Sequence, residues 1–216
     1  MDVEAARSQM IEQQVRAWDV LDSRVLAALA SVRREQFVPE AYSQLAFADT
    51  AIPLGFGQHM LPPKVEGRIL QALAPEPDHA VLEIGTGRGF FAACLAAMAG
   101  RVRTVEIRGE LAHQARACLR AAGIAGIAVD TADALTLKPE PVYDAVALTA
   151  ALPVYDARFE GWLKPGGRLF VVVGTAPAME ARLVTKVTDR AVRHDSLFET
   201  VIDPLHGARA PNPFQF

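Results

Sequence analysis

Along the first part of the chain, hydrophobic residues recur at the spacing of amphipathic helices. This pattern predicts one helix over residues 3–18 and a second that begins at a cap formed by Asp22 or Ser23. Residues 39–63 break the pattern with closely spaced prolines and glycines, so we expect a long irregular loop there. Loops of this kind often carry functional residues.

From residue 63 onward, short apolar runs alternate with amphipathic segments. Pro63 suits the first turn of a helix over residues 63–73. Strands are predicted at residues 80–84, 102–105, 127–129, 143–149 and 168–173, with helical segments between them at residues 90–99, 109–122 and 157–163. This alternation favours a parallel sheet with right-handed crossovers. Residues 181–188 and 192–202 instead predict two successive strands that form an antiparallel hairpin.

These elements together predict an α/β protein with a Rossmann-like, doubly wound, mostly parallel seven-stranded sheet, a C-terminal antiparallel hairpin and an N-terminal helical extension. With 216 residues, 51% of them hydrophobic, the chain is long enough for one such domain with a sizeable core. We expect the N-terminal helices and a substrate loop in residues 1–78, a cofactor-binding core in residues 79–174, and the hairpin and a tail in residues 175–216.

Charge and cysteine usage narrow the functional class. A formal net charge of -3 and a pI near 6.0 argue against a nucleic-acid-binding surface. Cys94 and Cys118 lack paired spacing and neighbouring histidines, so we expect no metal site and two buried thiols in a reducing compartment. The chain begins without the pattern of a signal peptide and has no bilayer-spanning run. We therefore expect a cytoplasmic protein without a membrane partner, and its oligomeric state stays open.

Three glycines follow the first core strand at alternate positions. They are Gly85, Gly87 and Gly89, and they give the backbone the freedom it needs where a ligand lies against the main chain. The helix that begins at Phe90 would direct its positive end toward that ligand. Phe90 also stands where the dinucleotide fingerprint requires its third glycine. With Glu83 ahead of the first glycine, this loop resembles the first motif of Rossmann-like S-adenosylmethionine methyltransferases.

Acidic residues near the ends of the core strands suit such a cofactor. Glu106 ends the second core strand about twenty residues after the loop, where a ribose-binding carboxylate is expected. Glu83 lies between apolar residues and needs partners there, so it either contacts the cofactor's ammonium or supports the ligand from behind. Asp133 either bonds the adenine amino group or caps the next segment. The proposed cofactor-binding residues are Glu83, Gly85, Thr86, Gly87, Gly89, Glu106, Ile107, Asp133, Ala134 and Ala151.

Over most of its length the chain resembles the protein-L-isoaspartate O-methyltransferases. The matching segments are residues 10–15, 24–29, 37–39, 48–49, 52–55, 57–58, 81–87, 143–146, 149–151 and 163–168. The glycine loop and the Pro-Gly-Gly turn at residues 165–167 occur in many methyltransferases, whereas residues 52–58 are much more specific. The resemblance implies a Rossmann-like fold, S-adenosylmethionine as methyl donor, and as acceptor the isoaspartyl residues that form as proteins age. We expect the acceptor to contact Pro53, Gln58, Met60, Leu61 and Thr149.

The chain departs from this family just after the Gly-Gln pair. The family continues with Thr-Ile-Ser-Gln-Pro, whereas this chain has His59-Met-Leu-Pro-Pro63, so Leu61 replaces the active-site serine. Leucine can donate no hydrogen bond to an acceptor carboxylate. A carboxylate with a pKa of about 4 is already ionised at neutral pH, so its methylation needs alignment rather than a base. A phenol, alcohol or amine must lose a proton, which His59 could accept as a catalytic residue, or His59 is a loop residue satisfied by the backbone.

Three functional hypotheses follow from these residues. The first is an S-adenosylmethionine-dependent O-methyltransferase that acts on isoaspartyl-containing proteins or peptides. The second is a methyltransferase of the same scaffold with a small hydroxylated acceptor. The third is a protein that binds the cofactor without catalysis and acts through its N-terminal helices. Glu83, the glycine loop and Glu106 are intact, so each hypothesis retains S-adenosylmethionine as the ligand.

Overall fold

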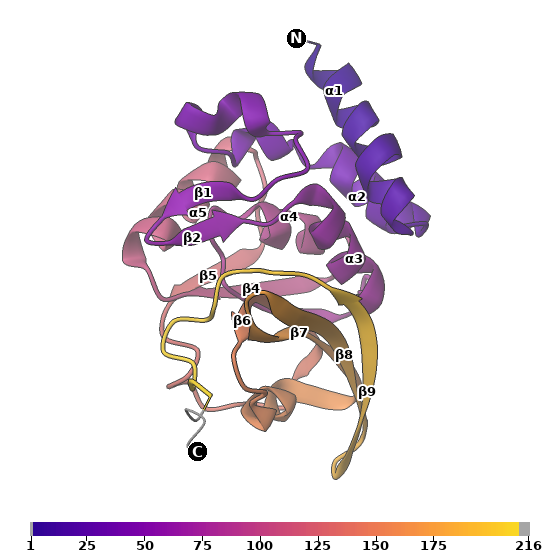
Figure 1. Ribbon diagram of the computed structural model, residues 1–216, viewed down its shortest axis with the longest axis vertical. Coiled ribbons are helices and arrows are strands. Elements are labelled where there is room, and N and C mark those ends of the chain that lie inside the picture. Colours follow the sequence, from indigo (N-terminus) through magenta and orange to yellow (C-terminus); the bar gives the residue numbers. More distant parts are fainter. Residues whose placement is uncertain (1, 212–216) are drawn as a thin grey trace.

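The structure, a computed structural model, describes residues 2–211 and is built around a seven-stranded sheet (Figure 1). The strands lie in the order β5-β4-β3-β6-β7-β8-β9. Their bounds are β3 Ala80–Ile84, β4 Arg101–Glu106, β5 Ile127–Thr131, β6 Tyr143–Leu152, β7 Leu163–Thr175, β8 Ala178–Thr188 and β9 Ala191–Glu199. From β5 to β7 neighbouring strands are parallel, and β8 and β9 add an antiparallel hairpin. The predicted fold class is confirmed.

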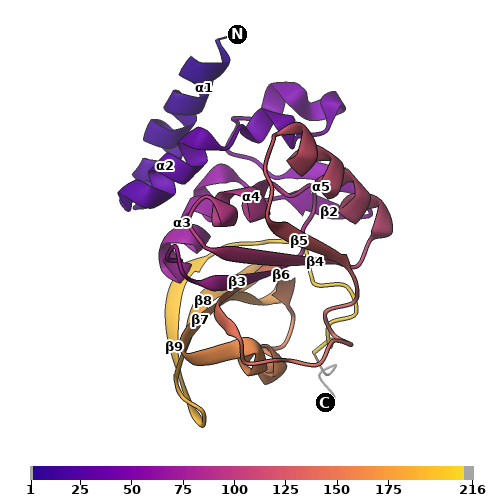
Figure 2. The same cartoon turned by 180° about the vertical axis from the view of Figure 1, so that it is seen from behind.

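Three α-helices cover one face of this sheet, as Figures 1 and 2 show from opposite sides. They are α3 (Pro63–Leu73), α4 (Phe90–Ala96) and α5 (Gly109–Ala121). Pro63 occupies the first turn of α3, where a missing N–H is tolerated. The opposite face is covered more thinly, by the 3-10 helix Ala157–Trp162 and connecting segments, with Phe159 and Trp162 packed in a second hydrophobic cluster.

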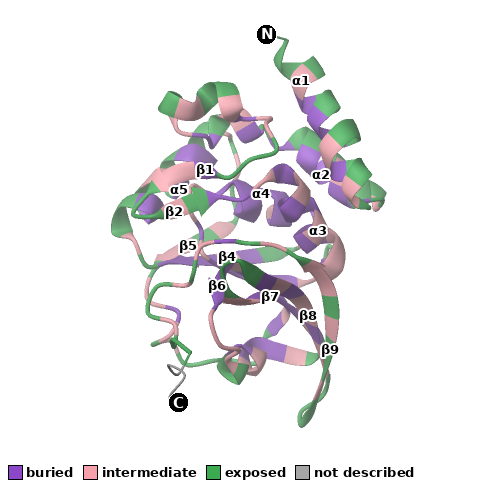
Figure 3. Ribbon diagram, in the orientation of Figure 1, coloured by how far each residue is buried: buried purple, intermediate pink, exposed green. Residues whose placement is uncertain are grey.

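The N-terminal segment forms a helical layer outside α3. The single helix expected over residues 3–18 is divided into α1 (Val3–Met10), a π-helical turn Ile11–Val15 and a 3-10 turn Arg16–Trp18. Helix α2 (Ser23–Ser31) follows, and the carboxylate of Asp22 accepts a hydrogen bond from the backbone N–H of Arg24. Asp22 is therefore the cap, rather than Ser23. Both helices expose their outer faces and bury the inner ones (Figure 3).

The expectation of an irregular loop over residues 39–63 is wrong. This stretch contains the 3-10 helix Glu40–Leu45 and an antiparallel hairpin of β1 (Ile52–Gly55) and β2 (Gln58–Met60). The turn between the strands uses positive φ angles of 91°, 57° and 69° at Gly55, Phe56 and Gly57. The glycines that suggested a loop in fact close a hairpin, since they adopt this backbone conformation without strain. Pro53 is tolerated because the hairpin has only two strands.

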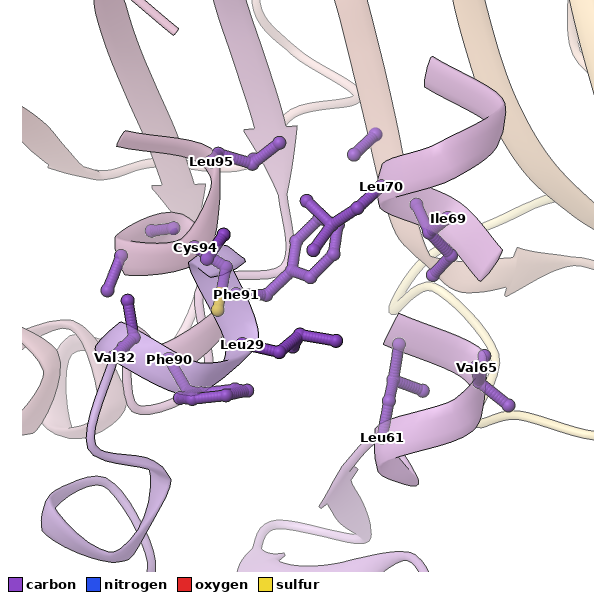
Figure 4. Close-up of a cluster of buried hydrophobic side chains, with 14 of the residues drawn as sticks. Leu29, Val32, Leu61, Val65, Ile69, Leu70, Phe90, Phe91, Cys94 and Leu95 are labelled. Carbon is purple, nitrogen blue, oxygen red and sulfur yellow. The ribbon is translucent and has the colours of Figure 1, made fainter. Parts of the chain in front are cut away.

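A hydrophobic cluster joins the N-terminal helices to the sheet. Figure 4 shows Leu70 of α3 and Phe91 of α4 pointing toward one another, with Leu29 of α2 beside them. Burial of such side chains stabilises each by about 1.5–3 kcal/mol relative to exposure. That the chain forms a single domain with three regions stays a prediction, and this shared cluster supports the single domain. None of the helices among residues 2–211 has the length and apolarity needed to cross a membrane.

After β9 the chain returns across the carboxyl ends of the parallel strands, where it appears in yellow in Figure 1. The backbone N–H of Ala151 donates to the carbonyl oxygen of Asp203 at 2.8 Å, and the N–H of Leu205 donates to that of Ala151, also at 2.8 Å. We call residues 203–206 the strap. The last part of the predicted tail, residues 212–216, lies outside the described residues.

Candidate functional site: two joined pockets at the sheet edge

Two adjacent pockets lie at the carboxyl ends of β3, β4 and β6. The first is bounded by the glycine loop, the β1–β2 hairpin and the start of α4. The second lies between the end of β4, residues 132–134 and the strap. The two pockets adjoin one another, because four residues line both: Gln58, Gly85, Glu106 and Ala150. Ligands of open α/β sheets bind at this edge of the fold.

The glycine loop is fixed from the neighbouring strand by Thr149. The Thr149 hydroxyl lies 3.0 Å from the carbonyl oxygen of Ile84 and 2.8 Å from that of Gly85. A Cβ on Gly85 would lie 2.5 Å from this hydroxyl oxygen, so no side chain fits there. Thr149 lines the first pocket as expected of a substrate contact, but the geometry gives its hydroxyl a structural partner in the loop.

Glu106 lies against the glycine loop at the junction of the pockets. Its Oε2 accepts a hydrogen bond from the backbone N–H of Gly87, and its Oε1 accepts one from that of Arg108, each at 3.0 Å. These bonds hold the carboxylate at the end of β4, the position predicted for a ribose contact. Each carboxylate oxygen can accept a further hydrogen bond, so a ligand hydroxyl can still be bound.

Glu83 presents an unsatisfied oxygen within the first pocket. The side chain is fully buried, and its Oε2 accepts a 2.5 Å hydrogen bond from the hydroxyl of Thr104. Its Oε1 is buried without a hydrogen-bond partner among residues 2–211. Burial raises the pKa of Glu83 to about 8, and the neighbouring carboxylates of Glu106 and Glu66 add to the effect. A ligand ammonium would satisfy this oxygen, so the pocket fits a cofactor that carries one.

Most of the other predicted cofactor contacts line one of the two pockets. Thr86 and Gly87 line the first pocket. Ile107, Asp133 and Ala134 line the second, and Oδ1 of Asp133 also accepts a hydrogen bond from the N–H of Leu135 at 2.9 Å.

Two predicted cofactor contacts lie elsewhere. A Cβ on Gly89 would meet Leu119 and Ala115 of α5, so this glycine serves helix packing. Ala151 is buried beneath the strap, and its neighbour Ala150 lines the pockets instead.

The β1–β2 hairpin forms the wall expected to contact the acceptor. Gln58, His59, Met60 and Leu61 all line the first pocket, whereas Leu54 rather than Pro53 reaches it from β1. The Nδ1 atom of His59 lies 3.0 Å from Oδ2 of Asp203. The hairpin and the strap therefore meet over the site.

A buried ion pair behind the hairpin was not predicted. Arg34 is fully buried and donates to Oε2 of Glu66, to the carbonyl oxygen of Leu61 at 2.7 Å and to that of Ala46 at 2.9 Å. Its guanidinium carbon lies 4.7 Å from the ring centroid of Phe90. Glu66 is 2% exposed and lines the first pocket. Burial raises the pKa of Glu66 to about 7, although Arg34 opposes this shift.

A sequence signal for Glu66 was available. Glu66 shares its helical face with Ile69, Leu70 and Leu73, so it is an acidic residue on the apolar face of α3. A charge in that position needs a buried partner. The contribution of Leu205 and His206 to the second pocket had no comparable signal, because it depends on where the strap lies.

Comparison with known proteins gives consistent matches over nearly the whole chain. The family model for protein-L-isoaspartate(D-aspartate) O-methyltransferase matches residues 5–209. A protein-L-isoaspartate O-methyltransferase of Rhodopseudomonas palustris (strain HaA2) is 38% identical over 206 residues, which cover 94% of this chain and 84% of the relative.

Solved structures agree with the fold. A structure named protein-L-isoaspartate O-methyltransferase superposes with a TM-score of 0.81 at 19% identity, covering 94% of this chain and 67% of the other. A candidate protein-L-isoaspartate O-methyltransferase of Plasmodium falciparum, in complex with S-adenosyl-L-homocysteine, has a TM-score of 0.77 at 15% identity, covering 95% and 98% of the two chains.

Proposed function

This chain belongs to the protein-L-isoaspartate(D-aspartate) O-methyltransferase family, and from this membership we infer that it methylates the free carboxylate of isoaspartyl residues in proteins and peptides. The structural observation that best supports binding of the methyl donor is the buried Oε1 of Glu83, which has no hydrogen-bond partner among residues 2–211 and belongs to a side chain that lines the first pocket. The methyl donor of the family is S-adenosylmethionine, which supplies a methyl group on a positively charged sulfur.

We assign the cofactor contacts from the geometry of the two pockets. Glu83 is suited to accept hydrogen bonds from the ligand's ammonium, and Glu106 from its ribose hydroxyls. Asp133 and Ala134 line the second pocket, where a flat adenine ring would lie between the end of β4 and the strap. The small side chain of Ala134 leaves room for the ring.

Methylation of a carboxylate requires the protein mainly to position the acceptor against the methyl donor. An acceptor carboxylate with a pKa of about 4 is ionised at neutral pH, so no proton has to be removed before the methyl group is transferred. Met60 and Leu61 supply a buried apolar wall that excludes water from the acceptor. Holding the reacting atoms in line can account for a large part of the rate enhancement.

The pairing of His59 with Asp203 favours a second candidate function. A carboxylate beside Nδ1 favours the tautomer with its proton on that nitrogen, which leaves a lone pair on Nε2. A histidine oriented in this way at a pocket can accept the proton of a phenol or alcohol. A small hydroxylated acceptor is therefore the alternative to the isoaspartyl carboxylate.

One assay separates the two functions. The protein is incubated with radiolabelled S-adenosylmethionine and an isoaspartyl peptide, and we expect a base-labile methyl ester on the peptide. Absence of the ester, with cofactor binding confirmed by calorimetry, would contradict the isoaspartyl function.

A phenolic acceptor tests the second candidate function. If His59 is the base, His59→Ala would abolish methyl transfer to this acceptor. The matched control is His113→Ala on the exposed side of α5, which should leave the transfer unchanged.

We also propose that the reaction takes place in the cytoplasm. Cys94 and Cys118 are both free and buried. Unpaired buried thiols are typical of proteins from reducing compartments, and this supports the proposal.

A further inference from the structure

The wall of the pocket that faces the acceptor has an unusual hydrogen-bonding character for the family that the chain resembles. That family places a serine hydroxyl, a hydrogen-bond donor, where this chain has Leu61. The carbonyl oxygen of Leu61 already accepts a hydrogen bond from Arg34, and the Leu61 side chain that lines the pocket is apolar. The nearby polar group on α3 is the carboxyl of Glu66, which accepts hydrogen bonds when ionised.

Most other polar side chains of the first pocket already have partners within the protein. The hydroxyls of Thr86 and Thr149 bond to Thr104 and to the glycine loop. His59 is paired with Asp203. Arg88 donates to the carbonyl oxygen of Phe37, to Gln114 and to the sulfur of Cys118.

One of the two carboxylate oxygens of Glu66 is available to bind a ligand. Arg34 holds Oε2, and Oε1 receives no hydrogen bond from residues 2–211. The α3 backbone and the guanidinium of Arg34 therefore fix the carboxyl group, while Oε1 can accept a donor from a ligand in the pocket.

The charges around the pocket also favour a positive group on the acceptor. Three carboxyl groups line the first pocket, those of Glu66, Glu83 and Glu106. Arg34 offsets one of them from behind, and Arg88 is engaged elsewhere. Burial raises the pKa of Glu66 to about 7 and that of Glu83 to about 8, so a group that brings a cation into the pocket would stabilise their ionised forms.

We propose that Glu66 binds the α-ammonium group of the acceptor, so that the preferred substrate is an isoaspartyl residue with a free amino group at the N-terminus of a peptide. This inference rests on the proposed isoaspartyl function. In such a residue the free carboxylate and the ammonium are attached to the same α carbon. One end of the acceptor can therefore bind Glu66 while the other is directed toward the methyl donor.

The reaction balances without a proton transfer. A carboxylate oxygen of the acceptor forms a bond to the methyl carbon, the bond from that carbon to sulfur breaks, and its electron pair stays on the sulfur. The products are the α-methyl ester and S-adenosylhomocysteine. The ammonium takes no part in bond making, so Glu66 acts as a specificity-determining residue.

Two peptides that differ at one group test the inference on the unaltered protein. One begins with isoaspartate and carries a free α-ammonium, and the other is the same peptide with an N-acetyl group. At pH 7 an α-amino group with a pKa of about 7.7–8.0 is mostly protonated. We expect kcat/KM to be roughly tenfold higher for the free peptide, the effect of one well-placed charged hydrogen bond.

The outcomes separate this inference from the function on which it rests. Equal or faster methylation of the acetylated peptide would overturn the inference and leave the isoaspartyl function intact. Methylation of neither peptide, by protein that binds S-adenosylhomocysteine in calorimetry, would overturn both.

A substitution at Glu66 supplies the second measurement. In Glu66→Gln the free-to-acetylated ratio should fall toward one, mainly through a higher KM for the free peptide. The matched control is Glu110→Gln, an exposed carboxylate in the first turn of α5, which should keep the ratio. Folding is checked by binding of S-adenosylhomocysteine. An unchanged ratio in folded Glu66→Gln would also overturn the inference, and the peptide comparison stands whether or not this variant folds.

Discussion

At the scale of single residues, the site is defined by polar groups whose hydrogen-bonding capacity is only partly satisfied within the protein. Glu83 has a buried oxygen that no group in the described part of the chain contacts by a hydrogen bond, and Glu66 has one oxygen held by Arg34. Sequence reasoning identified Glu83 because a carboxylate inside the apolar strand β3 is conspicuous. It missed the Arg34–Glu66 pair, since the two residues are distant in sequence and only the packing of α3 brings them together.

We expect Glu83→Gln to stabilise the ligand-free protein at pH 8 and to weaken cofactor binding. The pKa of Glu83 is raised from 4.5 to about 8 in the folded protein, so the stability present below pH 4.5 is lost as the pH rises through 8. Glutamine cannot ionise, and it should add about 1–3 kcal/mol at pH 8 and little at pH 5. Urea unfolding at both pH values measures this, with calorimetry for S-adenosylhomocysteine. A gain in stability that is the same at both pH values would contradict the explanation.

Leu61→Ser should raise activity on an isoaspartyl peptide. The new hydroxyl would donate to the acceptor carboxylate, and one hydrogen bond of about 1 kcal/mol corresponds to roughly fivefold in kcat/KM. The main chain at this position is already held by Arg34, so the hairpin should keep its place. Initial rates of methyl-ester formation give the answer. If they do not rise, the missing hydroxyl is not what limits the reaction.

At the scale of elements, the sequence predicted what depends on local patterns. Strand β3 has the bounds expected, because an apolar run ends directly at the glycine loop. The β1–β2 hairpin was missed, because Pro53, Gly55 and Gly57 are typical of irregular loops. The pairing of the two strands depends on the positive φ angles at the turn, which the sequence pattern does not show. The segment at residues 90–99 is shorter than expected, with α4 ending at Ala96. Most of the fold was therefore predictable from the sequence, whereas the β1–β2 hairpin, which is expected to contact the acceptor, was not.

Capping of α2 offers a test at this scale. Asp22→Ala should lower the free energy of unfolding by about 1 kcal/mol, because the N–H of Arg24 loses its acceptor. Asp22→Asn is the control, since asparagine caps equally well. Urea denaturation of the three proteins provides the comparison. An equal loss in both variants would point instead to the ion pair of Asp22 with Arg24.

At the scale of the whole molecule, the site is assembled from distant parts of the chain. The hairpin comes from the N-terminal region, the glycine loop from the core and the strap from the C-terminal region. His59 and Asp203 join the first of these to the last. No local pattern could predict this contact, because it depends on the path of the chain after β9.

We expect Asp203→Asn to speed the release of S-adenosylhomocysteine. Removing the carboxylate loosens the contact between hairpin and strap, which together border both pockets. The pair is partly exposed and should contribute about 1 kcal/mol or less, so the rate should rise by up to about fivefold. Stopped-flow displacement of the bound product measures this rate. Asp195→Asn in β9 is the control, and an identical rate in both variants would show that the contact does not restrain the ligand.

The position of the strap has a consequence for biosynthesis. Residues 203–206 complete the second pocket, yet they are translated after the whole sheet. The second pocket therefore stays incomplete in a growing chain until these residues have been added. Any ligand contact that depends on the strap can therefore form only after residues 203–206 have been synthesised and have left the ribosome.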